Sequence, residues 1–173
     1  MLKIGVLVSG GGTNLQAIID EINKGNLQAQ ITTIVSNNDS AYALERGKQN
    51  NIPTCVIKKS DFDSKISFER FLINHLKDKE VELVVLAGFM TILSGEFVDA
   101  FENRIINVHP SLIPSFCGKG FYGKKVHEAA LERGVKITGA TVHFVDKGTD
   151  TGPIIIQKAV DVLEDDTPDS LQK

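Results

Sequence analysis

The stretch Leu83-Val84-Val85-Leu86-Ala87 decides the fold class of this chain of 173 residues. A continuous apolar run of this length is typical of a strand that is covered on both faces, as in the centre of a parallel sheet. Further apolar runs lie on both sides of it along the chain, and segments with apolar residues at helical spacing separate them. The expected strands cover residues 3–9, 30–36, 53–57, 83–87, 104–108, 137–145 and 153–160.

This alternation of strands and helices predicts an α/β, Rossmann-like fold, with a mostly parallel twisted sheet and helices on both faces. The length suits a single domain over residues 1–173. In such sheets ligands bind beyond the carboxyl ends of the strands. Loops over residues 10–14, 88–93, 108–123 and 146–152 all follow expected strands, so we expect the functional groups there.

Composition excludes several classes of protein. The net charge of −3 argues against a nucleic-acid-binding surface. No apolar run approaches the ~20 residues that cross a bilayer, and because the N-terminus leads directly into a strand we expect no secretion. We therefore expect no membrane association and a cytoplasmic location. Two cysteines make neither a disulfide framework nor a metal site, and the four histidines show no ligand spacing, so no metal is expected.

The glycine-rich loop Ser9-Gly10-Gly11-Gly12-Thr13-Asn14 lies between an expected strand and an expected helix. Exposed backbone N–H groups and the helix dipole at such a junction favour a phosphate. The alternative is that Thr13 or Asn14 only caps the helix. No Lys-Ser/Thr pair follows, and the third glycine of a dinucleotide fingerprint is missing, so a monophosphate is favoured over NAD.

Asn107 and His109 follow the apolar run Arg104-Ile105-Ile106. Side chains at positions i and i+2 of a strand point to the same face, so an amide and an imidazole converge there. A lone histidine at a strand end is more often only hydrogen-bonded in the core or at the surface. The second signal is Asp150, on a loop bounded by Gly152 and Pro153, although Asp-x-Gly-Pro is also an ordinary turn.

Together these motifs resemble the folate-dependent formyltransferases of purine biosynthesis, over nearly the whole chain. The resemblance rests on the glycine loop and on the following segments: Leu86-Ala87-Gly88-Phe89-Met90, Ile92-Leu93-Ser94, Asn107-Val108-His109-Pro110-Ser111-Leu112 and residues 139–153. It implies the formyltransferase fold and transfer of a formyl group from 10-formyltetrahydrofolate, as co-substrate, to the amine of glycinamide ribonucleotide. It also implies direct attack in a ternary complex and an enzyme that is a monomer or a homodimer.

The resemblance assigns roles to individual positions. Asn107, His109 and Asp150 match the catalytic trio, in which a nearby carboxylate favours the charged imidazole. Gly12, Thr13 and Asn14 match the loop that binds the ribonucleotide phosphate. The expected folate-binding residues are Lys65, Met90, Thr91, Ile92, Leu93 and Asn107.

The sequence departs from its relatives at several places. Thr91 and Lys65 stand where relatives often have Arg, and the loop 116–123, with Cys117, is unusually rich in glycine. Relatives also continue beyond Pro168-Asp169-Ser170-Leu171, so we expect this chain to lack their C-terminal helical segment. His75 and His127 are expected to be solvated, and His143 is expected to be a supporting or packing residue.

Four alternative functions stay open. A formyltetrahydrofolate deformylase would use water as the acceptor but usually carries an N-terminal regulatory domain. A methionyl-tRNA formyltransferase would bring a C-terminal RNA-binding domain and a more basic surface. A non-catalytic nucleotide- or folate-binding protein would bind folate without formyl transfer, and a dehydrogenase would bind a nicotinamide cofactor.

Overall fold

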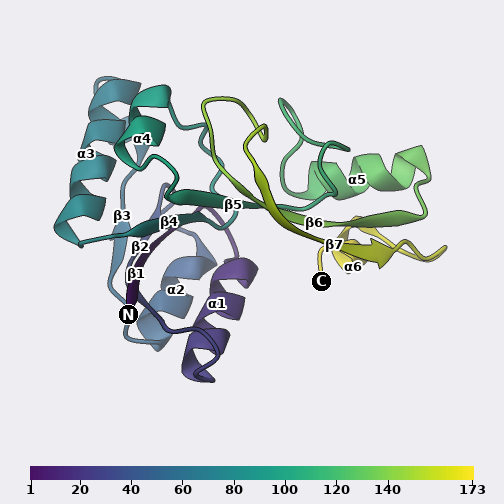
Figure 1. Cartoon of the computed structure of the whole chain (residues 1–173), viewed down its shortest axis with the longest axis horizontal. Coiled ribbons are helices and arrows are strands. Elements are labelled where there is room, and N and C mark those ends of the chain that lie inside the picture. The colour runs from purple at the N-terminus through teal and green to yellow at the C-terminus, as the bar shows by residue number, and fades with distance from the viewer. The chain divides into compact units, whose positions relative to one another are not determined.

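The computed structural model describes residues 1–173 and contains seven strands and six α-helices (Figure 1). Hydrogen-bonded neighbours in the sheet follow the order β3-β2-β1-β4-β5-β6-β7. Helices and strands alternate along most of the chain, which confirms the predicted α/β class with a mostly parallel sheet. The chain divides into two compact units, residues 1–106 and 107–173.

The first unit holds the parallel part of the sheet. Its strands are β1 (Leu2–Val8), β2 (Ala29–Ser36), β3 (Thr54–Val56) and β4 (Leu83–Leu86), and β5 (Ile105–His109) begins at its end. Its helices are α1 (Thr13–Asn23), α2 (Tyr42–Gln49), α3 (Lys65–Asp78) and α4 (Gly95–Ala100). Helices α1 and α2 lie on one side of these strands, and α3 and α4 lie on the other (Figure 1).

Burial explains why β4 and the residues of β1 from Ile4 onward are apolar. Val6, Leu7, Val8 and Val84 are almost fully buried, because helices cover both faces of the strands that carry them. Gly5 of β1 lies where a Cβ would come within 2.9 Å of side-chain atoms of Leu76 and Val81. The absence of a side chain at this position therefore lets α3 pack closely on the sheet.

The second unit combines an antiparallel strand pair with two helices. Strand β6 (Ile137–Phe144) pairs antiparallel with β7 (Ile154–Asp161), α5 (Lys124–Arg133) precedes them, and α6 (Pro168–Leu171) follows. Its buried side chains are unusually polar; among them are Ser111, Thr141 and the imidazoles of His109, His127 and His143. Buried polar groups require hydrogen-bond partners, so this unit carries a connected polar network.

No helix of the structure is long and apolar enough to cross a membrane.

Candidate functional site

The glycine loop lies where β1 ends and α1 begins. Gly12 is the residue that precedes the helix, has a φ of 69°, and makes no side-chain capping bond. The helix is therefore not capped by Thr13 or Asn14, which removes the alternative interpretation of these residues. Gly11 and Thr13 are exposed, and the N–H groups of the first turn lie at the positive end of the helix dipole.

Arg46 of α2 fixes the shape of this loop. Its Nε donates to the Gly11 carbonyl at 2.8 Å, and its Nη1 donates to Oε1 of Gln16 at 3.0 Å. The backbone N–H of Ala43 donates to the Gly10 carbonyl at 3.1 Å. Because the carbonyls are turned toward α2, the loop is held in a defined conformation without using its own N–H groups.

The segment 90–93, expected to bind folate, follows β4 and lies beside the glycine loop in the same unit. The backbone N–H of Met90 donates to Oγ of Ser9 at 2.8 Å, and Nδ2 of Asn37 donates to Oγ1 of Thr91 at 2.9 Å. The Met90 and Ile92 side chains are 54% and 67% exposed. Thr91 therefore makes a contact within the protein, while two apolar side chains face solvent.

Lys65 lies at the start of α3 and has a partner of its own. Its Nζ is 3.5 Å from Oε1 of Glu69, a carboxylate that is almost fully buried. Glu69 also accepts hydrogen bonds from the backbone N–H and the hydroxyl of Ser94. Sequence reasoning missed Glu69, although a glutamate among the inward-facing residues Phe68, Leu72 and Leu76 of one helix was a visible signal.

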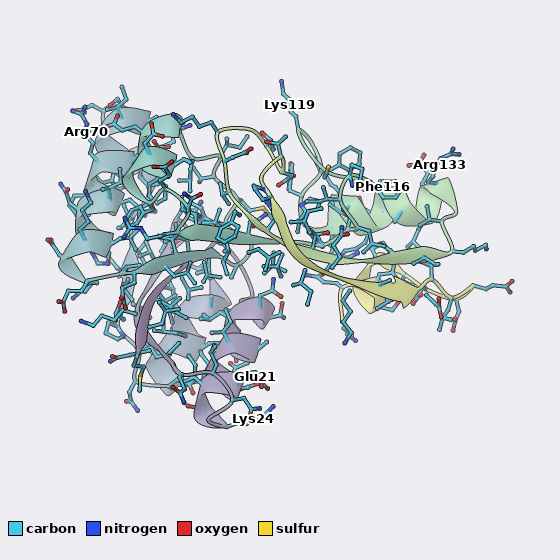
Figure 2. All side chains as sticks on the ribbon, in the orientation of Figure 1. Glu21, Lys24, Arg70, Phe116, Lys119 and Arg133 are labelled. Carbon is cyan, nitrogen blue, oxygen red and sulfur yellow. The ribbon has the colours of Figure 1, made fainter.

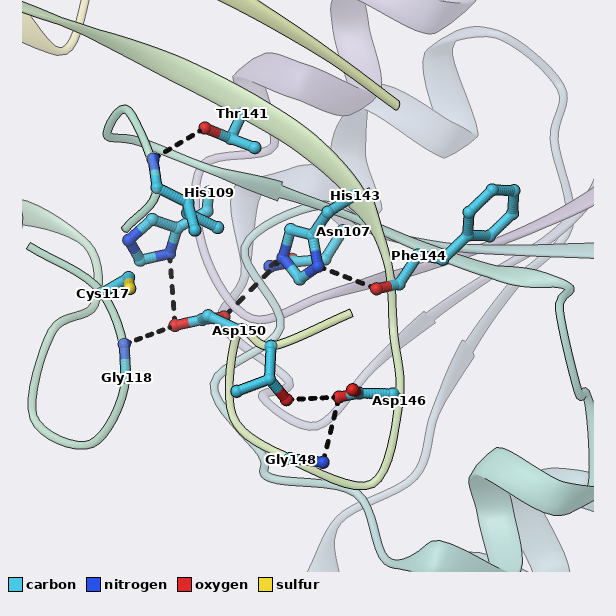
Figure 3. Close-up of polar contacts among 12 residues, drawn as sticks. Asn107, His109, Cys117, Gly118, Thr141, His143, Phe144, Asp146, Gly148 and Asp150 are labelled. Carbon is cyan, nitrogen blue, oxygen red and sulfur yellow. Dashed lines mark hydrogen bonds and ion pairs between the residues drawn. The ribbon is translucent and has the colours of Figure 1, made fainter. Parts of the chain in front are cut away.

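In the second unit, His109 and Asp150 lie next to each other (Figure 3). Nδ1 of His109 is 3.6 Å from Oδ2 of Asp150, and the His109 ring is 4% exposed. Nε2 of His109 is 2.9 Å from the Phe116 carbonyl, which can only accept a hydrogen bond. Nε2 therefore donates to this carbonyl, and the Asp150 carboxylate faces the other ring nitrogen.

Asp150 is presented by a tight loop between β6 and β7. Asp150 has a φ of 58°, and Oδ1 of Asp146 anchors the loop by accepting from the Gly148 N–H at 3.0 Å and from the Thr151 hydroxyl at 2.6 Å. At Gly152, a Cβ would come within 1.9 Å of the Phe144 carbonyl oxygen. Glycine is therefore required where this loop returns to the sheet.

Asn107 contacts His143 rather than His109. Nδ1 of His143 lies 2.9 Å from the Phe144 carbonyl and so carries the proton, which leaves Nε2 to accept from Nδ2 of Asn107 at 3.1 Å. Nε2 of His143 is also 3.8 Å from Oδ1 of Asp150. His143 thus lies between the amide and the carboxylate.

The loop after Pro114 contributes backbone groups to this cluster. The Gly118 N–H donates to Oδ2 of Asp150 at 2.9 Å, and Cys117 lies beside it (Figure 3). Burial, and secondarily the Asp150 charge, raises the pKa of the Cys117 thiol. The thiol is therefore protonated at neutral pH and is a poor nucleophile. Lys119 is exposed, and its side chain points outward from the tip of the loop (Figure 2).

Two histidines differ from the sequence prediction. His127 was expected to be solvated but is only 5% exposed, and its Nδ1 has no hydrogen-bond partner. Burial, with a smaller contribution from His109, lowers the pKa of His127, so its ring is neutral. His75 is partly buried, with Nε2 3.0 Å from Oγ1 of Thr33. Helix-face reasoning failed at both positions because tertiary packing covers faces that look polar in the sequence.

No group of three or more His, Cys, Asp or Glu side chains is arranged to hold a metal ion.

Comparison with known proteins identifies the family. A family model described as formyl transferase matches residues 2–173. The chain is 40% identical over 169 residues to the chloroplastic phosphoribosylglycinamide formyltransferase of Vigna unguiculata, covering 98% of this chain and 54% of that protein. It thus spans about half the length of that relative. Over 173 residues it is 38% identical to the phosphoribosylglycinamide formyltransferase of Bacillus subtilis (strain 168), covering 100% of this chain and 86% of that protein.

A solved structure agrees with the sequence relatives. The crystal structure of glycinamide ribonucleotide transformylase 1 from Symbiobacterium toebii has a TM-score of 0.93 and 43% identity, covering 99% of this chain and 79% of that one. The predicted formyltransferase fold is therefore confirmed. Since the family model spans all but the first residue, the chain belongs to the formyl transferase family, in the group that contains the phosphoribosylglycinamide formyltransferases.

Proposed function

We propose that this protein transfers the formyl group of 10-formyltetrahydrofolate to the amine of glycinamide ribonucleotide, as a step of purine biosynthesis. The observation that carries the proposal is the cluster of His109, Asp150, His143 and Asn107 within one unit of a chain from this family. Two imidazoles, one carboxylate and one amide, all largely shielded from water, suit direct acyl transfer to an amine.

In the proposed reaction the amine nitrogen attacks the formyl carbon, and the carbonyl becomes a tetrahedral oxyanion. Asn107 and the His109 imidazolium stabilise this negative charge. The bond from the formyl carbon to the folate nitrogen then breaks, the amine loses its proton, and the folate nitrogen gains one through His109. Asp150 positions the His109 ring from the Nδ1 side. The transfer is direct in a ternary complex, with no covalent enzyme intermediate.

The proposed binding roles are divided between the glycine loop, the segment 90–93 and Lys65. Gly12, Thr13 and Asn14 bind the ribonucleotide phosphate, supported by the uncapped first turn of α1. Residues 90–93 bind the folate ring, supported by the exposed apolar side chains of Met90 and Ile92. Lys65 is proposed to contact the folate through the ammonium that also faces Glu69.

The test is a formyl-transfer assay with wild-type protein, His109→Ala and His75→Ala. His109→Ala should lower kcat by about 10²–10⁴, the usual contribution of a general acid–base group. His75→Ala is the matched control, because it removes a partly buried histidine of the other unit. An inactive wild-type protein contradicts the proposal. Release of formate instead of formylated ribonucleotide would identify water as the acceptor.

A further inference from the structure

We propose that Glu69 is a positioning residue for the formyl-donor site. Its carboxylate holds Ser94, the residue that directly follows the segment 90–93, and so fixes that segment for the folate. This inference rests on the proposed function, because it assigns a role in donor binding to a residue that does not itself contact the donor.

The contacts of Glu69 occupy both carboxylate oxygens. Oε1 accepts from the backbone N–H of Ser94 at 2.9 Å and lies 3.5 Å from Nζ of Lys65. Oε2 accepts from the hydroxyl of Ser94. Glu69 is only 2% exposed. A buried carboxylate is costly unless it is paired and hydrogen-bonded, so these donors explain how the charge is tolerated inside the protein.

Ser94 is the point at which the segment 90–93 becomes a helix. Its hydroxyl caps α4 by accepting from the Phe97 N–H at 3.4 Å while it donates to Glu69. One hydroxyl therefore connects the buried carboxylate to the first turn of α4. Both hydrogen bonds of Ser94 to Glu69 constrain the direction in which the chain leaves residue 93.

The other end of the segment is anchored independently. Ser9 accepts from the Met90 N–H, and Asn37 donates to Thr91. A segment held at both ends keeps the exposed side chains of Met90 and Ile92 in place, which lowers the entropy lost when a ring packs against them. Glu69 supplies the anchor at the carboxyl end, and it also holds the ammonium of Lys65 near that end.

The experiment compares Glu69→Gln, Ser94→Ala and Glu96→Gln with wild type in steady-state assays in which each substrate is varied. A glutamine cannot accept from the Ser94 N–H and hydroxyl with both of its terminal atoms, and it has no charge for Lys65. The control removes the negative charge from the exposed pair of Arg70 Nε with Glu96 Oε1, 3.0 Å apart, which also joins α3 to α4.

We expect Glu69→Gln and Ser94→Ala to raise the KM for 10-formyltetrahydrofolate about tenfold, equivalent to the loss of one hydrogen bond to a charged group. The KM for glycinamide ribonucleotide and kcat should stay within about twofold of wild type, and Glu96→Gln should change none of the three. Hydrogen exchange of residues 88–94 should be faster in the first two variants than in the control.

An unchanged KM for the donor in both variants, or an equal rise for both substrates, would overturn the inference. If Glu69→Gln does not fold, Ser94→Ala decides alone, because its hydroxyl is only partly buried. A wild-type protein without formyl transfer would contradict the proposed function instead. In that case the exchange measurement still tests Glu69, since unchanged exchange at residues 88–94 would refute its anchoring role.

Discussion

The backbone N–H of Gly118 donates to Oδ2 of Asp150 at 2.9 Å, and this same oxygen lies 3.6 Å from Nδ1 of His109. The Phe116 carbonyl, two residues earlier, contacts Nε2 of the same imidazole at 2.9 Å. One short loop thus contacts both members of the proposed acid–base pair through its backbone. The relative placement of His109 and Asp150 therefore depends on the conformation of residues 116–118.

Asp150→Asn should lower kcat by about 10²–10³, on the scale of losing one electrostatic contribution to a charged transition state. Asparagine can still accept from the Gly118 N–H, but it removes the negative charge that lies 3.6 Å from Nδ1 of His109. Asp146→Asn is the matched control, because Asp146 anchors the same loop without contacting His109. Equal losses in the two variants would show that only loop structure matters. Single-turnover rates at saturating substrates make this comparison.

Gly12→Ala should destabilise the protein and weaken binding of the ribonucleotide, whereas Gly11→Ala should do neither. A Cβ on Gly12 would lie 2.7 Å from Cβ of Ala43, and the φ of 69° is unfavourable for alanine. We expect a loss of about 2 kcal/mol in unfolding free energy from the backbone conformation and the crowding together. At Gly11 a Cβ meets nothing within 4 Å. Urea denaturation and the KM for the ribonucleotide check both variants, and similar effects at the two positions would disprove the expectation.

His127 should make the protein less stable as the pH falls below about 6.5, the ordinary histidine value. Burial and the nearby His109 lower the pKa of His127 in the folded state, so the unfolded state binds more protons between the folded and unfolded pKa values. The contribution of neutral His127 to the free energy of unfolding is therefore complete at pH values above its pKa in the unfolded state. It declines as the pH falls toward its pKa in the folded state. His75 contributes in the same direction, because burial, followed by Lys79, lowers its pKa as well.

His127→Leu should reduce this pH dependence of the stability, because leucine does not titrate. Leucine also has no buried nitrogen without a hydrogen-bond partner. The measurement is the Tm between pH 8 and pH 5.5 for wild type and variant. As the pH is lowered, the Tm of wild type should fall more than the Tm of His127→Leu. Parallel curves for the two proteins would mean that His127 is not responsible.

Gly152→Ala should abolish most of the activity by moving Asp150. The added Cβ would meet the carbonyl oxygen of Phe144 at 1.9 Å, so the end of the loop must shift. Gly148 lies in the same loop but would meet only the Thr151 side chain, at the cost of its hydrogen bond to Asp146 and without a backbone clash. We therefore expect Gly148→Ala to retain more activity than Gly152→Ala, as measured by kcat. The reverse order would contradict the assigned loop geometry.

Local patterns predicted the elements well. The apolar run 83–87, the glycine break after Ser9 and the helical spacing over Phe68, Leu72 and Leu76 correspond to β4, the start of α1 and α3. These features can be predicted because the spacing of apolar residues and the positions of glycine breaks are local properties of a chain. The family resemblance, which spanned the same segments, is confirmed by the match to the formyl transferase model.

Local sequence patterns did not predict the surroundings of several polar side chains. His127 was expected to be solvated because it lies beside Glu128 near the start of an expected helix, yet the ring is buried. The partnership of Asn107 with His143 was not predicted either, because it joins residues 36 positions apart. The burial of Glu69 was also not predicted, because its partner Ser94 lies 25 positions further along the chain.

The sequence by itself thus determined the order of strands and helices, the glycine loop and the family, because each depends on residues close together in the chain. The resemblance already implied that Asp150 lies near His109. The tertiary structure alone decided which side chains are buried and which other polar atoms meet: Asn107 with His143, and Glu69 with Ser94. The physical reason is that burial and hydrogen-bond geometry depend on distances between residues far apart in the chain, and packing sets those distances.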